Sequence, residues 1–105
     1  MSHIIEEIAK KQSIPVSPLD KKVEQFASIC NEITDLYQKK NHDYGDAFSK
    51  SIDEFGDVAA LVRINDKFNR LKNLILVKDR EVMDESVQDT LKDMASYCIM
   101  FAMEK

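Results

Sequence analysis

The fold of this chain is decided by residues 84–103, which read DESVQDTLKDMASYCIMFAM. Apolar residues recur there at alternating steps of four and three, which is the spacing of one face of an amphipathic helix. The predicted core stripe consists of Val87, Leu91, Met94, Cys98 and Phe101. Asp84 is a suitable N-cap, so the pattern predicts a helix over residues 84–103.

Three carboxylates, Glu85, Asp89 and Asp93, follow one another at steps of four along nearly the opposite face of this helix. Like charges at that spacing destabilise a helix by a few tenths of a kcal/mol each. We therefore expect a divalent cation or a basic side chain beside them. The alternative is a solvated surface on which the acids favour the positive N-terminal end of the helix.

Beyond Asp93 the predicted helix is apolar on nearly every side. Met100 and Met103 occupy there the face that carries carboxylates in the first half of the helix. A small bundle cannot bury a helix on every side. Residues 95–103 therefore predict an interface between two copies of the chain, that is, a homodimer.

Two further helices precede this one. Ser17-Pro18-Leu19-Asp20 is a start signal for a helix over residues 18–39, and Ser51 with Glu54 forms a second capping box for a helix that reaches residue 75 or 76. Gly56 is tolerated near the start of the latter at a cost of about 1 kcal/mol. The predicted core stripes are Val23, Phe26, Cys30, Ile33 and Tyr37 in the first, and Leu61, Ile64, Phe68, Leu71 and Ile75 in the second.

These patterns predict an all-α fold, a small bundle of three main helices plus a short helix in an N-terminal leader, residues 1–17. Residues 18–105 then form a single domain. Only two glycines and two prolines occur among the 105 residues, too few turn residues for a hairpin-rich sheet.

Composition excludes several classes of protein. A net charge of −4 argues against direct nucleic-acid binding, which requires an excess of lysine and arginine. No apolar run approaches the roughly 20 residues of a transmembrane helix, and the N-terminus lacks the features of a signal peptide, so we expect a cytoplasmic protein without a membrane partner. Cys30 and Cys98 lie on apolar faces and are expected to be buried free thiols.

Two other segments carry candidate binding groups. Residues 39–46 read as a loop in which Gly45 supplies an unusual backbone conformation, or else as a helix C-terminus whose lysines favour the helix dipole. Arg63, Lys67 and Arg70 form a basic stripe. That stripe is suited to hold phosphates, or equally to pair with the acids of the last helix.

Three motifs stand out together: Lys40-Asn41-x-Asp43-Tyr44-Gly45, Arg63-x-x-Asp66-Lys67-x-x-Arg70-Leu71-x-x-Leu74, and Asp84-Glu85-Ser86-x-x-Asp89-Thr90-Leu91-x-Asp93-x-x-x-Tyr97. In this combination they resemble the first nucleotide-modification-associated domain family, which occurs in phages and bacteria. The similarity spans roughly residues 28–103 and implies a role in nucleotide or DNA-base modification.

More distantly, the chain is similar to the all-α nucleoside triphosphate pyrophosphohydrolases of the MazG and dimeric dUTPase kind. Those enzymes hold magnesium between two acidic helix motifs. Glu32 and Asp35 resemble the first motif, while Asp93 and Tyr97 match the second. Thr90 stands where the second motif has glutamate. Either Glu85, Asp89 or Asp43 replaces that acid, or the catalytic metal is lost.

The resemblance implies a Mg²⁺-dependent protein that hydrolyses a nucleoside triphosphate to a monophosphate and pyrophosphate. The catalytic candidates are Asp43, Glu85, Asp89 and Asp93, and the metal candidates are Glu85, Asp89 and Asp93. The candidates for substrate binding are Lys40, Asn41, Tyr44, Arg63, Lys67 and Arg70. The alternatives are a non-catalytic module that binds a nucleotide or a partner protein, and a purely structural helical dimer.

Overall fold

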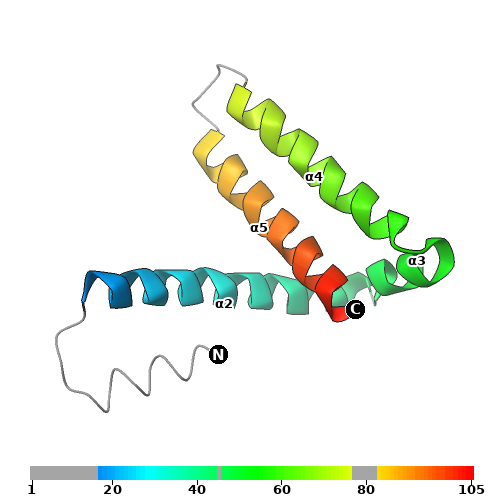
Figure 1. The fold of residues 1–105 in the computed structure, drawn as a ribbon, viewed down its shortest axis with the longest axis horizontal. Coiled ribbons are helices and arrows are strands. Elements are labelled where there is room, and N and C mark those ends of the chain that lie inside the picture. The colour runs from blue at the N-terminus through cyan, green and yellow to red at the C-terminus, as the bar shows by residue number, and fades with distance from the viewer. Residues whose placement is uncertain (1–16, 45, 77–82) are drawn as a thin grey trace, which may run out of the picture. The chain divides into compact units, whose positions relative to one another are not determined.

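The computed structural model describes residues 17–44, 46–76 and 83–105. Within these residues it contains helices and no strand (Figure 1). The helices are α2 (Pro18–Tyr44), α3 (Ala47–Phe55), α4 (Val58–Leu76) and α5 (Met83–Met103). The all-α class is therefore confirmed, while the short N-terminal helix predicted in the leader lies outside the described residues. None of the described helices is long and apolar enough to cross a membrane.

The chain divides into two compact units, residues 1–39 and 40–105. In the first unit the predicted capping box of α2 is confirmed. The backbone N–H of Asp20 donates to Ser17 Oγ at 3.1 Å, and the backbone N–H of Ser17 donates to Asp20 Oδ2 at 3.2 Å. These reciprocal bonds satisfy backbone N–H groups that the first turn of a helix leaves without a partner.

The predicted core stripe of α2 is only partly buried. Ile33 is buried and Tyr37 half-buried, whereas Val23, Phe26 and Cys30 are exposed. The expectation of a continuous buried face is therefore wrong for those three. The described part of this unit is a single helix, and one helix cannot bury its own apolar face.

The segment predicted as a loop at residues 39–46 is mostly helical, because α2 continues to Tyr44. The chain turns at Asp46, which has a left-handed backbone (φ 55°). Its N–H donates to the side-chain oxygen of Asn41 at 3.0 Å. Asparagine thus stabilises a conformation that costs energy in a residue other than glycine.

The helix predicted to start at Ser51 instead starts at Ala47 and is interrupted at Gly56. Gly56 has φ 78°, and its N–H donates to the carbonyl of Ile52 at 2.7 Å, so it caps the end of α3. The prediction that Gly56 sits inside the helix is wrong, because glycine is the residue that adopts a positive φ at a helix end most readily. Ser51 lies within α3, where its hydroxyl donates to the carbonyl of Ala47.

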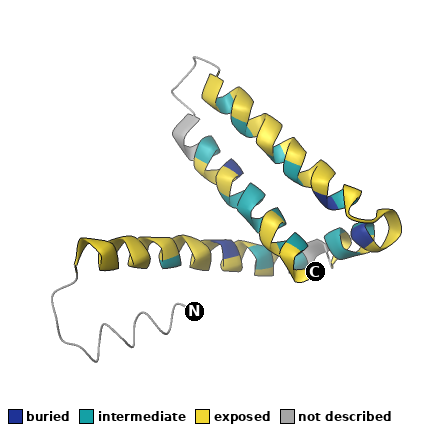
Figure 2. Ribbon diagram, viewed as in Figure 1, coloured by how far each residue is buried: buried dark blue, intermediate teal, exposed yellow. Residues whose placement is uncertain are grey.

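In the second unit α3 packs on α4, and α4 lies antiparallel beside α5 (Figure 1). Figure 2 shows buried segments on α4 and on α5. The most buried residues belong to this pair of helices: Ala60 on α4 is 0% exposed and Thr90 on α5 is 2% exposed. The buried and half-buried residues of α4 are Ala59, Ala60, Ile64, Lys67, Leu71 and Leu74. The predicted stripe is therefore displaced by one position at three places, where Leu61, Phe68 and Ile75 are exposed.

A similar displacement occurs on α5. Val87, Met94 and Phe101 are half-buried as the pattern predicts, but Leu91 and Cys98 are exposed and Thr90 is buried. Cys30 and Cys98 are both free, yet neither is buried, so that part of the prediction is wrong. Towards the end of α5, Ile99 and Met103 are exposed in the single chain.

Candidate functional site

The candidate site is built around Asp93, in the middle of α5. Thr90, about one turn earlier, is the buried residue in the described part of this helix. Residues three apart lie on nearly the same face of a helix, so Asp93 lies close to the buried face. Its side chain is 27% exposed. Of the predicted acidic row, Asp89 is exposed, and the side chain of Glu85 lies outside the described residues.

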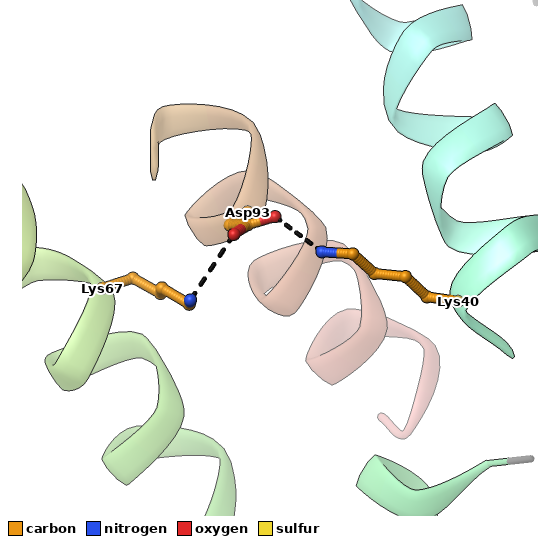
Figure 3. Close-up of polar contacts among 3 residues, drawn as sticks. All are labelled: Lys40, Lys67 and Asp93. Atoms are coloured by element: carbon orange, nitrogen blue, oxygen red, sulfur yellow. Dashed lines mark hydrogen bonds and ion pairs between the residues drawn. The ribbon is translucent and has the colours of Figure 1, made fainter. Parts of the chain in front are cut away.

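Two lysines converge on this carboxylate (Figure 3). Lys40 Nζ, from the last part of α2 that belongs to the second unit, donates to Asp93 Oδ1 at 2.9 Å. Lys67 Nζ, from α4, lies 3.4 Å from Asp93 Oδ2. Each oxygen therefore has its own ammonium group. Lysines from two helices hold one carboxylate, and we call Lys40, Lys67 and Asp93 the charged cluster.

Partial burial raises the pKa of Asp93, but the hydrogen bond and charge of Lys40, and then the charge of Lys67, outweigh it. The net effect is a pKa below the usual value of an aspartate, so the carboxylate is ionised at neutral pH. The expectation that a basic side chain would lie beside the acidic row is thus confirmed at Asp93.

The basic stripe of α4 divides between two environments. Lys67 is half-buried against Asp93, whereas Arg63 and Arg70 are exposed. The ion-pair interpretation of the stripe is therefore confirmed for Lys67. The role predicted for the two arginines in substrate binding stays a prediction.

The remaining predicted residues lie at the turn that follows Lys40. Asn41 holds the backbone of Asp46, which gives it a structural role in positioning the turn. The side chains of Asp43 and Tyr44, and Gly45 as a whole, lie outside the described residues. The predictions for Asp43 and Tyr44 therefore stay predictions.

One feature of the site is not evident from the sequence alone. Phe48, in the first turn of α3, contacts Tyr97 of α5, with ring centroids 5.4 Å apart and planes tilted by 49°. Tyr97 lies four residues after Asp93, one turn further along the same face. The two contacts, Lys40 with Asp93 and Phe48 with Tyr97, thus join the end of α2 and the start of α3 to successive turns of α5.

The described residues contain no group of three or more histidine, cysteine, aspartate or glutamate side chains able to hold a metal ion. Mg²⁺, however, is usually bound through one or two carboxylates together with substrate phosphates and water. Asp93 is ionised and partly accessible, and Asp89 is exposed one turn earlier. Their carboxylate oxygens are donors of the kind that Mg²⁺ binds, and the predicted magnesium site stays a prediction.

The sequence model of the family described as "Nucleotide modification associated domain 1" matches residues 40–104, more than half of the chain. The chain belongs to this family. The match starts at Lys40 and includes Lys67 and Asp93. Glu32 and Asp35 precede it. No curated protein and no solved structure matches the chain.

The nucleotide-modification-associated domain coincides closely with the second compact unit, residues 40–105. The three residues of the charged cluster come from its beginning, its middle and its last helix. A domain that starts at Lys40 therefore includes the helix end that supplies the first lysine of the cluster.

Proposed function

We propose that this domain binds the phosphate chain of a nucleotide at Lys40, Lys67 and Asp93. The observation that carries the proposal is the convergence of two ammonium groups on one half-buried carboxylate. Ammonium groups are point charges suited to phosphate oxygens. Membership of the nucleotide-modification-associated family supports a nucleotide as the source of those phosphates.

The reaction that we propose is Mg²⁺-dependent hydrolysis of a nucleoside triphosphate in the cytoplasm. A water oxygen attacks the α-phosphorus, the bond from that phosphorus to its bridging oxygen breaks, and a monophosphate and pyrophosphate leave. Lys40 and Lys67 would stabilise the charge that grows on the phosphate oxygens. Asp89, Glu85 or Asp43 would accept the proton of the water as general base.

Asp93 is the ligand that we propose for the magnesium ion, with Asp89 or Glu85 as the second carboxylate. When bound, Mg²⁺ neutralises phosphate charge and polarises the phosphorus–oxygen bonds. Thr90 does not contribute to this set, because its side chain is buried between the helices. A hydroxyl is also a poor substitute for a carboxylate on this ion.

The proposal is tested by measuring pyrophosphate release from a panel of ordinary and modified nucleoside triphosphates with Mg²⁺. We expect Asp93→Ala to abolish turnover, and Lys67→Ala to lower it about 100-fold. Asp57→Asn is the matched control, because Asp57 pairs with Lys105 at an exposed position of the same unit. Equal turnover by the Asp93→Ala protein and wild type would contradict the proposed site.

A binding module without catalysis is the second candidate, and the buried Thr90 at the place of the expected acid favours it. Equilibrium dialysis with the same nucleotides separates the two functions. Binding that is lost in Lys40→Ala together with Lys67→Ala, without turnover in wild type, would select the module. If the folded wild-type protein binds no nucleotide, the purely structural dimer is the interpretation that remains.

We also propose that the domain forms a homodimer. We assign its interface to the outer seam of α4, defined as Leu61, Phe68 and Ile75, in place of residues 95–103, where the sequence predicts it. The outer-seam side chains are 58%, 48% and 60% exposed. Their spacing of seven residues is symmetric about Phe68. An antiparallel second copy therefore places Leu61 opposite the partner's Ile75 and Phe68 opposite its equivalent, as a two-fold interface requires. Exposed apolar patches of roughly a few hundred Å² commonly mark interaction surfaces.

Sedimentation equilibrium of wild type and Phe68→Glu tests this assembly. We expect a dimer for wild type and a monomer for the variant, because the substitution places two carboxylates opposite each other at the two-fold axis. Asn69→Glu, an exposed neighbour on the same helix, is the matched control. A monomeric wild type, or a Phe68→Glu dimer as tight as wild type, would contradict the outer-seam interface.

A further inference from the structure

The charged cluster is complete without a ligand, because each oxygen of Asp93 already has an ammonium group. Lys40 Nζ lies 2.9 Å from Oδ1 and Lys67 Nζ lies 3.4 Å from Oδ2. The same two ammonium groups are the groups that a phosphate would need. A phosphate and Asp93 therefore compete for one pair of cations.

The two lysines differ in how readily they can exchange partners. The side chain of Lys40 is 57% exposed, whereas that of Lys67 is 29% exposed. Exposed lysine–carboxylate pairs contribute little free energy, since water solvates both partners well. Lys40 can thus leave Asp93 at low cost, while Lys67 stays beside α5 and offers a fixed positive charge.

We infer that Asp93 is an internal counter-anion, which a phosphoryl group displaces from Lys40 and Lys67, and that the displaced carboxylate then becomes available to a divalent cation. This inference rests on the proposed phosphate site. It assigns Asp93 two successive partners, lysines in the free protein and a cation in the loaded one. Phosphate binding alone separates Asp93 from its two ammonium groups, and cation binding alone withdraws Asp93 from Lys40 and Lys67.

The exchange couples the two ligands. Each ligand binds better when the other is present, because the groups released by one are the groups that the other needs. Such coupling is reciprocal: the factor by which Mg²⁺ raises the affinity for the phosphate equals the factor by which the phosphate raises the affinity for Mg²⁺. If the lysines that bind phosphate did not contact Asp93, phosphate and Asp93 would not compete for them.

Calorimetric titration with inorganic pyrophosphate, first in EDTA and then with Mg²⁺, tests the inference on the full chain. In EDTA we expect Asp93→Asn to bind pyrophosphate about tenfold more tightly than wild type, because the competing anion is gone. With Mg²⁺ we expect wild type to gain affinity and Asp93→Asn to gain none. The control Asp57→Asn should follow wild type in both buffers.

A second substitution at the same position shows whether the change in affinity is specific to asparagine. Asp93→Ala should show the same tighter binding in EDTA, and Lys40→Ala combined with Lys67→Ala should abolish binding. Equal or weaker binding by both Asp93 variants in EDTA, or no pyrophosphate binding by any folded variant, would overturn the inference. Turnover of nucleoside triphosphates is a separate measurement, so a protein that exchanges ligands without hydrolysis would contradict only the proposed reaction.

Discussion

Helix α4 presents two apolar faces that differ by a single position in the sequence. Ala60, on the inner face, is fully buried against its neighbours, whereas Leu61 is 58% exposed on the outer seam. Successive residues of a helix are rotated by about 100°, so the same apolar run supplies both faces. The contribution of a residue to stability is therefore set by its face more than by its type.

The difference arises because the apolar surface of α4 is wider than one neighbouring helix covers. Helices α3 and α5 both pack on α4, where Ala60 is buried and Ile64 and Leu71 are half-buried, while Phe68 is left exposed. The inner face also carries Lys67, one of the two cations at Asp93. We therefore expect substitutions on the inner face of the hairpin to affect folding, and those on the outer seam to affect assembly.

The largest effect is expected for Thr90→Glu, which places a carboxylate at a position only 2% exposed. A buried charge without a compensating partner destabilises a protein by about 3–5 kcal/mol. Urea denaturation should therefore give a much lower midpoint than for Gln88→Glu, an exposed position on the same helix. Similar midpoints for the two variants would show that Thr90 does not lie in the hairpin core.

Ala60→Leu should be the next most destabilising substitution. Ala60 has no exposed surface, so three additional carbon atoms must displace its neighbours. Overpacking of this kind costs about 1–3 kcal/mol. Thermal unfolding followed by circular dichroism checks the result, with Val62→Leu at an exposed position of α4 as the control. If both variants melt together with wild type, the inner face is not closely packed.

A smaller effect, with a defined pH dependence, is expected at Asp93. Its pKa is lowered in the folded protein, so the ion pairs stabilise the fold above the pKa of an unfolded aspartate. That contribution is lost as the pH falls through the lower, folded pKa. Asp93→Asn should therefore cost about 1 kcal/mol at pH 7 and little once both states are protonated.

Thermal melts in EDTA between pH 7 and pH 2 measure this difference. The gap between wild type and Asp93→Asn should close on the acidic side. Asp57→Asn should show a smaller gap at pH 7, because the Asp57 side chain is 52% exposed and its pair with Lys105 is well solvated. A gap at Asp93 that is independent of pH would mean that the ion pairs do not stabilise the fold.

The smallest effect on monomer stability is expected for Leu61→Gln on the outer seam. In dilute solution we expect a change within about 0.5 kcal/mol, as for most surface substitutions. At higher protein concentration the same variant should melt below wild type, because the proposed dimer stabilises only the wild-type fold. Melting curves at two concentrations distinguish these cases. A large loss in dilute solution would show that the outer seam belongs to the monomer core.

The sequence was most informative where a local rule acted alone. The capping box of Ser17 and Asp20 and the existence of α4 and α5 follow from short-range hydrogen bonding and apolar periodicity. The sequence also identified Asp93 and Lys67 as candidate site residues, because acidic side chains recur at helical spacing on one predicted helix and basic side chains on another. Gly56 was misplaced, since the need for a positive φ depends on how α3 meets α4.

Local patterns in the sequence are therefore enough to establish the helical class, the apolar sides of the helices and the charged residues able to form a site. Which part of each apolar side is covered depends on the packing of the helices, because the neighbours of α4 leave Leu61, Phe68 and Ile75 exposed. The tertiary structure also decided that Lys40 and Lys67, 27 residues apart, meet at the same carboxylate. Distances of that kind depend on the turn at Asp46 and on the packing of α4 against α5, which no local pattern encodes.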